Sequence, residues 1–279
     1  MIGFGEAARA FVEGWGSTAL PIAAYDLKAA EPTMQDAARH HGIGLGDKPG
    51  PALVGAQLAF CLVTADQALA AAEACAPFLP SGIVWLDGNS CSPGTKRQAA
   101  QVIEGAGGRY VDMAIMAPVH PRLNRTPALL AGPSAEAAIA LLDGLDMNTR
   151  FAGPTIGEAS TIKMLRSVIV KGFEALTAEC FLAARRAGVE DVVLGSLQAS
   201  DPGLDWPRRA TYNLERMMVH GVRRGAEMRE VAKTLRELGL PDRLASATAE
   251  WQQQVGGLAL GAGEDRLQSR LDAILGELK

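Results

Sequence analysis

Short apolar runs alternate with helical segments over the first half of the chain. Five runs are expected to form strands, because each has an apolar centre bounded by Gly, Pro, Asp or Asn: 22–25, 58–63, 83–86, 109–115 and 128–131. The segments between them show helical periodicity and end near Gly or Pro: 6–15, 34–41, 67–78 and 95–105. This alternation predicts βαβ units that build a parallel sheet. Only Met1 and Ile2 precede the first glycine, where a central strand usually runs about five residues.

Beyond about residue 150 the strand pattern stops and helical periodicity continues to the end. Residues 158–187 are predicted to form one helix, because apolar residues recur at 162, 165, 169, 173, 176 and 180 and Gly188 follows. At about 45 Å this helix is longer than a small domain needs, which is typical of a helix that joins two domains or runs through a dimer. Further helices are predicted at 207–224, 226–238, 243–254 and 264–278. We therefore expect an α/β domain over 1–152 and an all-helical domain over 153–279.

Composition narrows the class of protein. The 279 residues are 48% hydrophobic and 21% charged, with a net charge of −4, so a disordered chain, a coiled coil and a basic nucleic-acid or membrane-binding surface are not expected. Four cysteines show no CxxC pair and no metal-ligand spacing with the four histidines, so no metal is expected. Apolar stretches are too short to span a membrane and the start lacks a basic signal region. The reducing cytoplasm is the expected setting.

A glycine-rich turn, residues 3–8 with the pattern G-x-G-x-x-A, opens the first predicted helix. The first glycine allows a tight turn, the second lets the backbone approach a pyrophosphate, and the small alanine lets helix and strand pack closely. The helix N-terminus then directs free N–H groups and the positive end of its dipole at the phosphates. An ordinary glycine turn is the alternative. The pattern predicts a Rossmann-type dinucleotide site that includes Gly3, Phe4, Gly5, Glu6 and Ala7.

An acidic residue, Asp26, ends the second apolar run, 21 residues after Gly5. A carboxylate at this spacing accepts hydrogen bonds from the ribose hydroxyls of a dinucleotide. It also repels the additional phosphate of NADP, so NAD is the expected cofactor. Lys28 offsets part of that repulsion, which leaves NADP possible.

Polar side chains recur every four residues along one stripe of the predicted helix 158–187: Lys163, Ser167 and Lys171. Lys163 lies near the helix N-terminus, where the dipole disfavours a cation, and beside an apolar stripe. Both effects favour the neutral amine that a general base needs at neutral pH. Spacing alone leaves a solvated polar face as the alternative.

Several segments together resemble the β-hydroxyacid dehydrogenase family, which includes 3-hydroxyisobutyrate dehydrogenase and 6-phosphogluconate dehydrogenase. The resemblance covers essentially the whole chain and is stronger with a bacterial branch whose C-terminal domain, named after phosphogluconate dehydrogenase, is largely uncharacterised. The segments that carry it are the glycine turn 2–8, the loop 87–90 of sequence D-G-N-S followed by Pro93, and the stretches 111–118, 157–176 and 220–228.

This resemblance implies roles for individual residues. Lys163 would exchange the hydroxyl proton while hydride passes between the substrate carbon and nicotinamide. Val63 and Thr64 would contact the cofactor, and Asn89 and Ser90 the substrate or nicotinamide. The alternatives are a plain strand-to-helix turn capped by Thr64 and a loop that caps the following helix.

Two departures from the family pattern leave the substrate open. Met116, Ala117 and Pro118 stand where family members have a serine and two glycines, and Ser167 stands where they have an asparagine. These positions bind the substrate in the family. Ser167 still hydrogen-bonds a hydroxyl, whereas Met116 offers only apolar contact.

Two further groups have competing interpretations. Lys171 either binds a substrate anion or pairs with Glu174 on the helix surface. His220 lies one turn before Arg224, and this cationic group would bind a carboxylate in the partner's cleft of a homodimer. In the alternative, the adjacent arginines pair with Glu227 and His220 is buried.

The expected protein is an NAD(P)-dependent dehydrogenase that interconverts a hydroxy acid and its oxo acid, with Lys163 as the acid–base, and that forms a homodimer. Its partner is then a small molecule, with no nucleic acid or membrane involved. One alternative is an imine reductase, which usually lacks the lysine. Another is a non-catalytic, dinucleotide-binding redox sensor, which Met116, Pro118 and Ser167 favour. Decarboxylation after the oxidation stays open.

Overall fold

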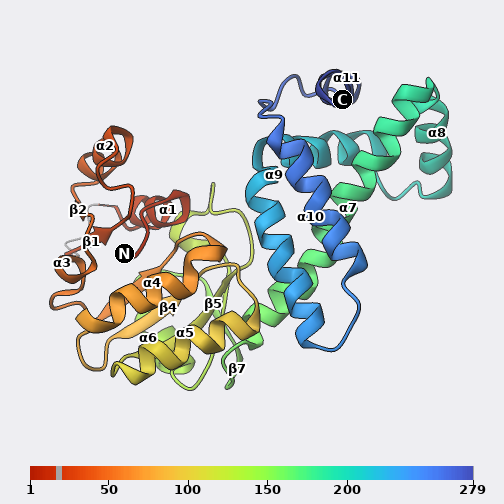
Figure 1. Cartoon of the computed structure of the whole chain (residues 1–279). Coiled ribbons are helices and arrows are strands. Elements are labelled where there is room, and N and C mark those ends of the chain that lie inside the picture. The colour runs from red at the N-terminus through yellow and green to blue at the C-terminus, as the bar shows by residue number, and fades with distance from the viewer. Residues whose placement is uncertain (17–20, 279) are drawn as a thin grey trace. The chain divides into compact units, whose positions relative to one another are not determined.

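The chain folds into two compact units. The structure is a computed structural model that describes residues 1–16 and 21–278. The sheet unit is Met1–Met164 and the helical unit begins at Leu165 (Figure 1). This division falls later than residue 152, because the start of the long helix is bonded to the sheet: Ser160 N donates to Asp112 Oδ2 at 2.9 Å.

The sheet unit has the strand order of a dinucleotide-binding fold. Its strands are β1 (Ala23–Tyr25), β2 (Gly44–Gly46), β3 (Leu58–Cys61), β4 (Val84–Asp87), β5 (Arg109–Ile115), β6 (Ala128–Ala131) and β7 (Thr149–Gly153). Ile2 bridges Tyr25 and Cys61 in parallel and so joins β1 to β3. The order is therefore β2-β1-Ile2-β3-β4-β5-β6-β7, with the glycine turn leaving the central position, as in doubly wound nucleotide-binding sheets.

The prediction of a parallel sheet is wrong for one pair, because β6 runs antiparallel to β5. The connection between them, residues 116–127, holds only the short 3₁₀ turn Leu123–Arg125. A parallel return needs a longer crossover, usually a helix. Two strands were also missed: β2 has a glycine at each end, and β7 is largely exposed at the sheet edge.

Helices cover both faces of the sheet. They are α1 (Glu6–Trp15), α2 (Pro32–His40), α3 (Pro49–Leu53), α4 (Ala68–Cys75), α5 (Pro93–Gly105) and α6 (Ala135–Asp143). Side chains of α1 and α6 pack with alternate strand residues such as Leu86, whereas α3, α4 and α5 pack with the opposite set, such as Trp85. Figure 1 shows α4 and α5 lying along one face. This alternation of buried side chains is what a sheet covered on both faces requires.

The helical unit contains most of α7 (Glu158–Ala187), with α8 (Glu190–Ser200), α9 (Trp206–Glu237), α10 (Arg243–Gly257) and α11 (Leu267–Glu277). The bounds predicted for α7 are confirmed, whereas α8 was missed. Met217, Met218 and Met228 are buried, as expected of core residues.

The break predicted between residues 224 and 226 is wrong, because α9 continues through Gly225. Glycines let α9 and α10 approach closely there. A Cβ on Gly221 would lie 2.4 Å from the carbonyl oxygen of Gln252, and a Cβ on Gly256 would lie 2.4 Å from the amide nitrogen of Val222. Gly225 lies against α10 in the same way, 3.2 Å from the carbonyl oxygen of Ala249. These glycines therefore serve helix packing.

Within the described residues, no helix is both long and apolar enough to cross a membrane. None of the four cysteines, all within the described residues, forms a disulfide; Cys61, Cys75 and Cys91 are buried and Cys180 is exposed. In the same part of the chain, no cluster of His, Cys, Asp or Glu is placed to hold a metal ion.

Candidate active site

The two glycines of the turn have different environments. Gly3 has φ +84°, and a Cβ on it would lie 2.6 Å from the carbonyl oxygen of Leu62 and 2.9 Å from Val63 Cγ1. Gly5 is the N-cap residue of α1, with φ −78°, and a Cβ on it would meet no atom within 4 Å. Gly3 is thus required by the fold. Gly5 leaves open space in front of a helix N-terminus, which suits the approach of a phosphate.

Asp26 lies where β1 ends and is fixed by two backbone amides. Its Oδ2 accepts a hydrogen bond from Phe4 N at 2.7 Å and its Oδ1 accepts one from Lys28 N at 2.8 Å. The carboxylate is half-buried, whereas the Phe4 side chain is fully buried, so Phe4 meets a ligand only through its backbone. The structure therefore brings Asp26 to the glycine turn, as the sequence predicts.

The other predicted cofactor residues lie at the same edge of the sheet. Glu6 and Ala7 form the first turn of α1, with Glu6 exposed and Ala7 half-buried. Val63 and Thr64 lie just beyond the end of β3, after Leu62, and Val63 lies beside Gly3. The open space at Gly5 and the carboxylate of Asp26 fit a dinucleotide, which these residues would hold by its pyrophosphate and its ribose.

A buried carboxylate, Asp87, organises the loop after β4. Its Oδ2 accepts a hydrogen bond from the Tyr110 hydroxyl at 2.6 Å, and its Oδ1 accepts from Asn89 N at 3.0 Å and from Asn89 Nδ2 at 2.7 Å. Lys96 Nζ lies 3.0 Å from Oδ1 and donates to the backbone oxygen of Asp87 at 2.5 Å. Burial, and then the charge of Asp87, raise the pKa of Tyr110 well above its usual value, so its hydroxyl stays a donor.

At the end of this loop two predicted residues meet. Lys163 Nζ donates to Ser90 Oγ at 2.7 Å. The neighbouring Asn89 is buried, and its Oδ1 is without a hydrogen-bond partner among the described residues. A buried acceptor without a partner carries an energetic cost that a bound donor removes. An amine and a hydroxyl therefore meet at the carboxyl end of β4, next in sequence to a buried amide oxygen that has no partner among the described residues.

The start of α7, which carries Lys163, is held by a second buried carboxylate. Asp112 Oδ2 on β5 accepts hydrogen bonds from Gly157 N at 3.1 Å and from Ser160 N at 2.9 Å, so it caps the positive end of the helix. Its Oδ1 lies 3.5 Å from Lys96 Nζ. Burial opposes the charge on Lys96, but its interactions with Asp87, Cys91 and Asp112 together outweigh burial and hold its pKa above the usual value. Lys96 is therefore a buried cation.

In the helical unit, Lys171 has a different partner from the predicted one. It is buried and pairs with Glu227 at 2.8 Å, and it also donates to Ser167 Oγ at 3.3 Å. The predicted surface pair with Glu174 is wrong, because Lys171 faces α9. Arg223 also pairs with Glu227, at 3.1 Å, which confirms one of the alternative pairings.

Glu174 is instead bound from two other helices. It accepts hydrogen bonds from Arg224 on α9 and from Gln252 Nε2 on α10, the latter at 2.7 Å. Arg224 is therefore engaged inside the helical unit. His220, one turn earlier on α9, is half-buried.

Met116 directly follows β5. It packs with a small cluster formed by alanines 114, 131 and 159, together with Leu129 and Ala152. Ala159 lies on α7, one turn before Lys163. Met116 also lines a hollow of about 330 Å³ with residues that include Asn148 and Arg150.

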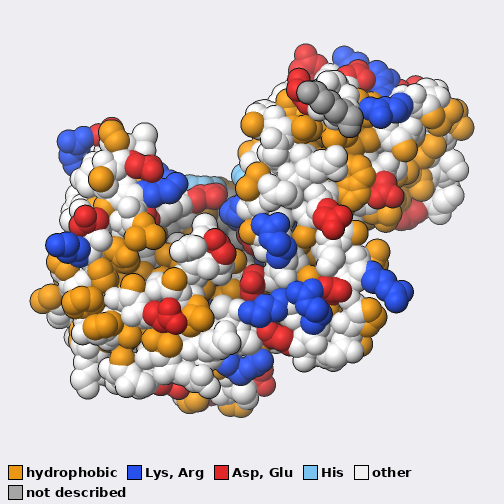
Figure 2. Space-filling model, viewed as in Figure 1, with side chains coloured by type: hydrophobic (Ala, Val, Ile, Leu, Met, Phe, Trp, Pro, Cys, Tyr) orange, Lys and Arg blue, Asp and Glu red, His pale blue; other side chains and the backbone are white. Residues whose placement is uncertain are grey.

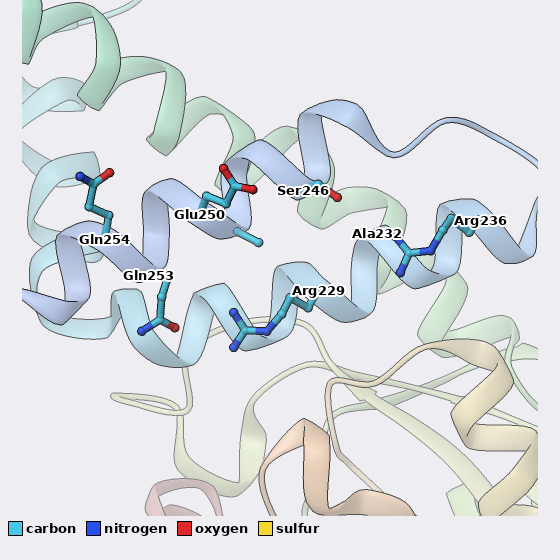
Figure 3. A pocket seen from close by; sticks show the side chains of 8 residues that line it. Arg229, Ala232, Arg236, Ser246, Glu250, Gln253 and Gln254 are labelled. Atoms are coloured by element: carbon cyan, nitrogen blue, oxygen red, sulfur yellow. The ribbon is translucent and has the colours of Figure 1, made fainter.

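A shallow groove of about 590 Å³ lies between α9 and α10 (Figure 3). Arg229 and Arg236 extend from one helix, and Glu250, Gln253 and Gln254 from the other. Arg236 is already paired with Asp242. None of the predicted site residues lines this groove.

Sequence reasoning missed Lys96 and Tyr110 and the function of Asp112. A signal for them was present, because Asp112 stands inside an apolar strand run and Asp87 directly follows one. A carboxylate buried in a strand needs a partner. That reasoning would have directed attention to Lys96, near the start of the next helix.

Comparison with known proteins agrees with this geometry. A solved conserved hypothetical protein from Sinorhizobium meliloti 1021 is 36% identical, with 99% of this chain and 95% of the other covered and a TM-score of 0.76. The conserved protein MTH1747, described as structurally similar to 3-hydroxyacid dehydrogenases, is 31% identical, with 90% and 97% covered and a TM-score of 0.67. The chain belongs to the family of these proteins.

Residues 184–255 match a domain of unknown function, DUF1932. The 3-hydroxyisobutyrate dehydrogenase of Mycobacterium tuberculosis shares the fold, at 13% identity over 98% of this chain and 97% of the other, with a TM-score of 0.73. Part of the helical unit thus matches DUF1932, and the whole chain has the fold of 3-hydroxyisobutyrate dehydrogenase.

Two other matches are partial or distant. An uncharacterised 28.5 kDa protein of Methanothermus fervidus is 27% identical over 150 residues, and the match spans 54% of this chain and 57% of that protein. A reductive aminase from Aspergillus terreus, solved with NADPH, shares the fold at 16% identity over 97% of this chain and 96% of its own, with a TM-score of 0.59.

Proposed function

We propose that this protein is an NAD(P)-dependent oxidoreductase that interconverts a β-hydroxy acid and its oxo acid. One observation carries the proposal: Lys163 Nζ lies 2.7 Å from Ser90 Oγ, at the end of the loop that follows β4. The same unit holds the glycine turn and Asp26. The fold shared with 3-hydroxyisobutyrate dehydrogenases and the sequence resemblance to the β-hydroxyacid dehydrogenase family support this assignment.

The chemistry divides between a cofactor and this chain's residues. Oxidation of the alcohol removes a hydride from carbon and a proton from oxygen. NAD(P)⁺, when bound, supplies the hydride acceptor. Lys163 takes the hydroxyl proton onto Nζ and returns it in the reverse reaction, while Ser90 orients the amine through its hydroxyl. Because Lys163 is half-buried, its proton exchanges with solvent between turnovers.

The cofactor contacts follow from the glycine turn. The α1 N-terminus at Gly5 would face the pyrophosphate, and Asp26 would accept hydrogen bonds from the adenosine ribose. A carboxylate at that place favours NAD over NADP, with Lys28 moderating the preference. Val63 and Thr64 would add backbone contacts from the end of β3.

For the substrate, Asn89, Ser90 and Ser167 are the proposed polar contacts. Lys171 is a weaker candidate for an anion site, because Glu227 balances its charge. Met116 and His220 are also proposed to contact the substrate, and only the family resemblance supports these two contacts.

A homodimer in the reducing cytoplasm is also part of this proposal. Apolar side chains recur along one stripe of α7 and are exposed: Leu165 by 40%, Ile169 by 75% and Leu176 by 65%. Figure 2 shows further hydrophobic side chains among charged ones on the surface. Exposed apolar stripes of this kind are typical of helix-pairing surfaces. The absence of disulfides among the described residues agrees with a reducing setting.

Fluorescence titration with NADH and NADPH, followed by a screen of hydroxy acids at 340 nm, tests the proposal. We expect tighter binding of NADH and turnover of at least one β-hydroxy acid. Turnover of imines alone would favour an imine reductase, and tight binding without any turnover would favour a redox sensor. Absence of binding to either dinucleotide would refute all three functions.

A further inference from the structure

We infer that Lys96 is a positioning residue that holds Lys163 and Ser90 together. The inference rests on the proposed function, in which these two groups handle the proton. Lys96 would thus be a further functional residue, and it lies outside the glycine turn, the loop after β4 and helix α7. Lys96 lies on α5, and its side chain is fully buried.

Two arms begin at the Lys96 ammonium. The first runs through Asp87, which Lys96 contacts at 3.0 Å through Oδ1 and at 2.5 Å through the backbone oxygen. The same Oδ1 accepts both N–H groups of Asn89. The turn that ends in Ser90 is therefore fixed by the carboxylate that Lys96 holds.

The second arm runs through Asp112, 3.5 Å from the ammonium. Its other oxygen accepts hydrogen bonds from Gly157 N, Ser160 N and Ser160 Oγ at 2.9–3.1 Å. These groups form the first turn of α7, and Lys163 follows three residues after Ser160. The arms meet again at the 2.7 Å hydrogen bond between Lys163 and Ser90, so Lys96 stands opposite that bond in a closed ring of contacts.

Charge explains why a lysine is used at this place. Asp87 and Asp112 are both fully buried, and two buried carboxylates without a cation repel each other and lack solvation. A buried ion pair contributes little to stability compared with apolar residues of the same volume. What the lysine provides is a fixed separation of the two carboxylates, and through them of Ser90 and Lys163.

The test compares Lys96→Met with Ser90→Ala and with Ile103→Ala. Ile103 lies on the same helix and is also fully buried, so its truncation destabilises the unit while leaving the ion network intact. The first readout needs no turnover: mass spectrometry gives the rate at which Lys163 is reductively methylated in cofactor-free protein. We expect K96M and S90A to change this rate in the same direction, by several-fold, and I103A to leave it unchanged.

The second readout is kcat/KM, and NADH affinity is measured as a control for intact cofactor binding. K96M should lower kcat/KM by about tenfold, as loss of a supporting contact does, with NADH affinity within about twofold of wild type. The double variant K96M/S90A should be no worse than S90A alone, because both act through one hydrogen bond. Additive losses, or a Lys163 methylation rate that K96M leaves unchanged, would overturn the inference.

If K96M does not fold, Asp112→Asn provides the same test. It keeps the Lys96–Asp87 contact and removes the negative charge through which Lys96 is connected to the start of α7. It should change the methylation rate of Lys163 as S90A does. An unchanged rate in D112N would also overturn the inference. Failure of the proposed function is distinguishable, since it abolishes the turnover readout and leaves the methylation readout intact.

Discussion

Alanine at each glycine of the phosphate-binding turn separates a binding role from a folding role. Gly5 has φ −78° and ψ −160°, open to any residue, and its Cβ would meet nothing within 4 Å. Gly5→Ala should therefore keep the free energy of unfolding within about 1 kcal/mol of wild type. At Gly3, φ of +84° costs alanine about 1–2 kcal/mol. Overlap of its Cβ with the carbonyl oxygen of Leu62 at 2.6 Å adds about 1–3 kcal/mol.

Although Gly5→Ala should change stability little, it should weaken NADH binding strongly. The methyl group of G5A occupies the space in which we place the phosphates, so NADH affinity should fall at least about tenfold, equivalent to about 1.4 kcal/mol. Urea unfolding gives the stability of both variants, and NADH fluorescence titration gives the affinity. G5A that binds NADH like wild type, or unfolds as easily as G3A, would refute the assignment of this turn.

Three further predictions concern packing, assembly and pH. Gly256→Ala places a Cβ 2.4 Å from Val222 N and should cost about 1–3 kcal/mol in thermal unfolding, whereas Gly257→Ala on the same helix, with nothing within 4 Å, should gain up to about 1 kcal/mol; equal shifts would contradict the close packing of α9 and α10. Ile169→Lys should give a monomer in sedimentation velocity while Val192→Lys, at 74% exposure on α8, stays dimeric; a monomeric wild type or two dimeric variants would contradict the α7 interface. Burial lowers the pKa of His41, with His40 adding to the effect, so the unfolded chain binds the proton first and stability falls as pH decreases below about 6.5; His41→Gln should reduce that slope in urea unfolding, and an unchanged slope would contradict it.

Some glycines in the sequence correctly predicted where helices begin and end. Gly188, in a left-handed conformation at φ +72°, ends α7 where predicted, and the glycine turn opens α1 at Glu6. Gly225 is also a glycine but does not end a helix, because it lies inside α9 where α10 packs closely against it. A glycine that serves tertiary packing looks the same in sequence as one that ends a helix.

The candidate site was predictable as far as the family resemblance reached. Lys163 and Ser90 were both named on that resemblance, and the structure joins them. The two strand carboxylates indicated that a buried partner was needed, but the sequence does not show that one lysine serves both, because Lys96 meets Asp87 and Asp112 only when α5 packs on β4 and β5. Lys171 illustrates the same limit, since its partner Glu227 comes from another helix.

The most direct test of the central claim is the turnover of Lys163→Ala on a substrate that the wild type oxidises, with added primary amines. A general acid–base contributes about 10²–10⁴-fold, so K163A should lose at least a hundredfold in kcat while NADH affinity stays within about twofold. Small amines should restore part of the rate. A K163A enzyme that turns over like wild type would contradict the account.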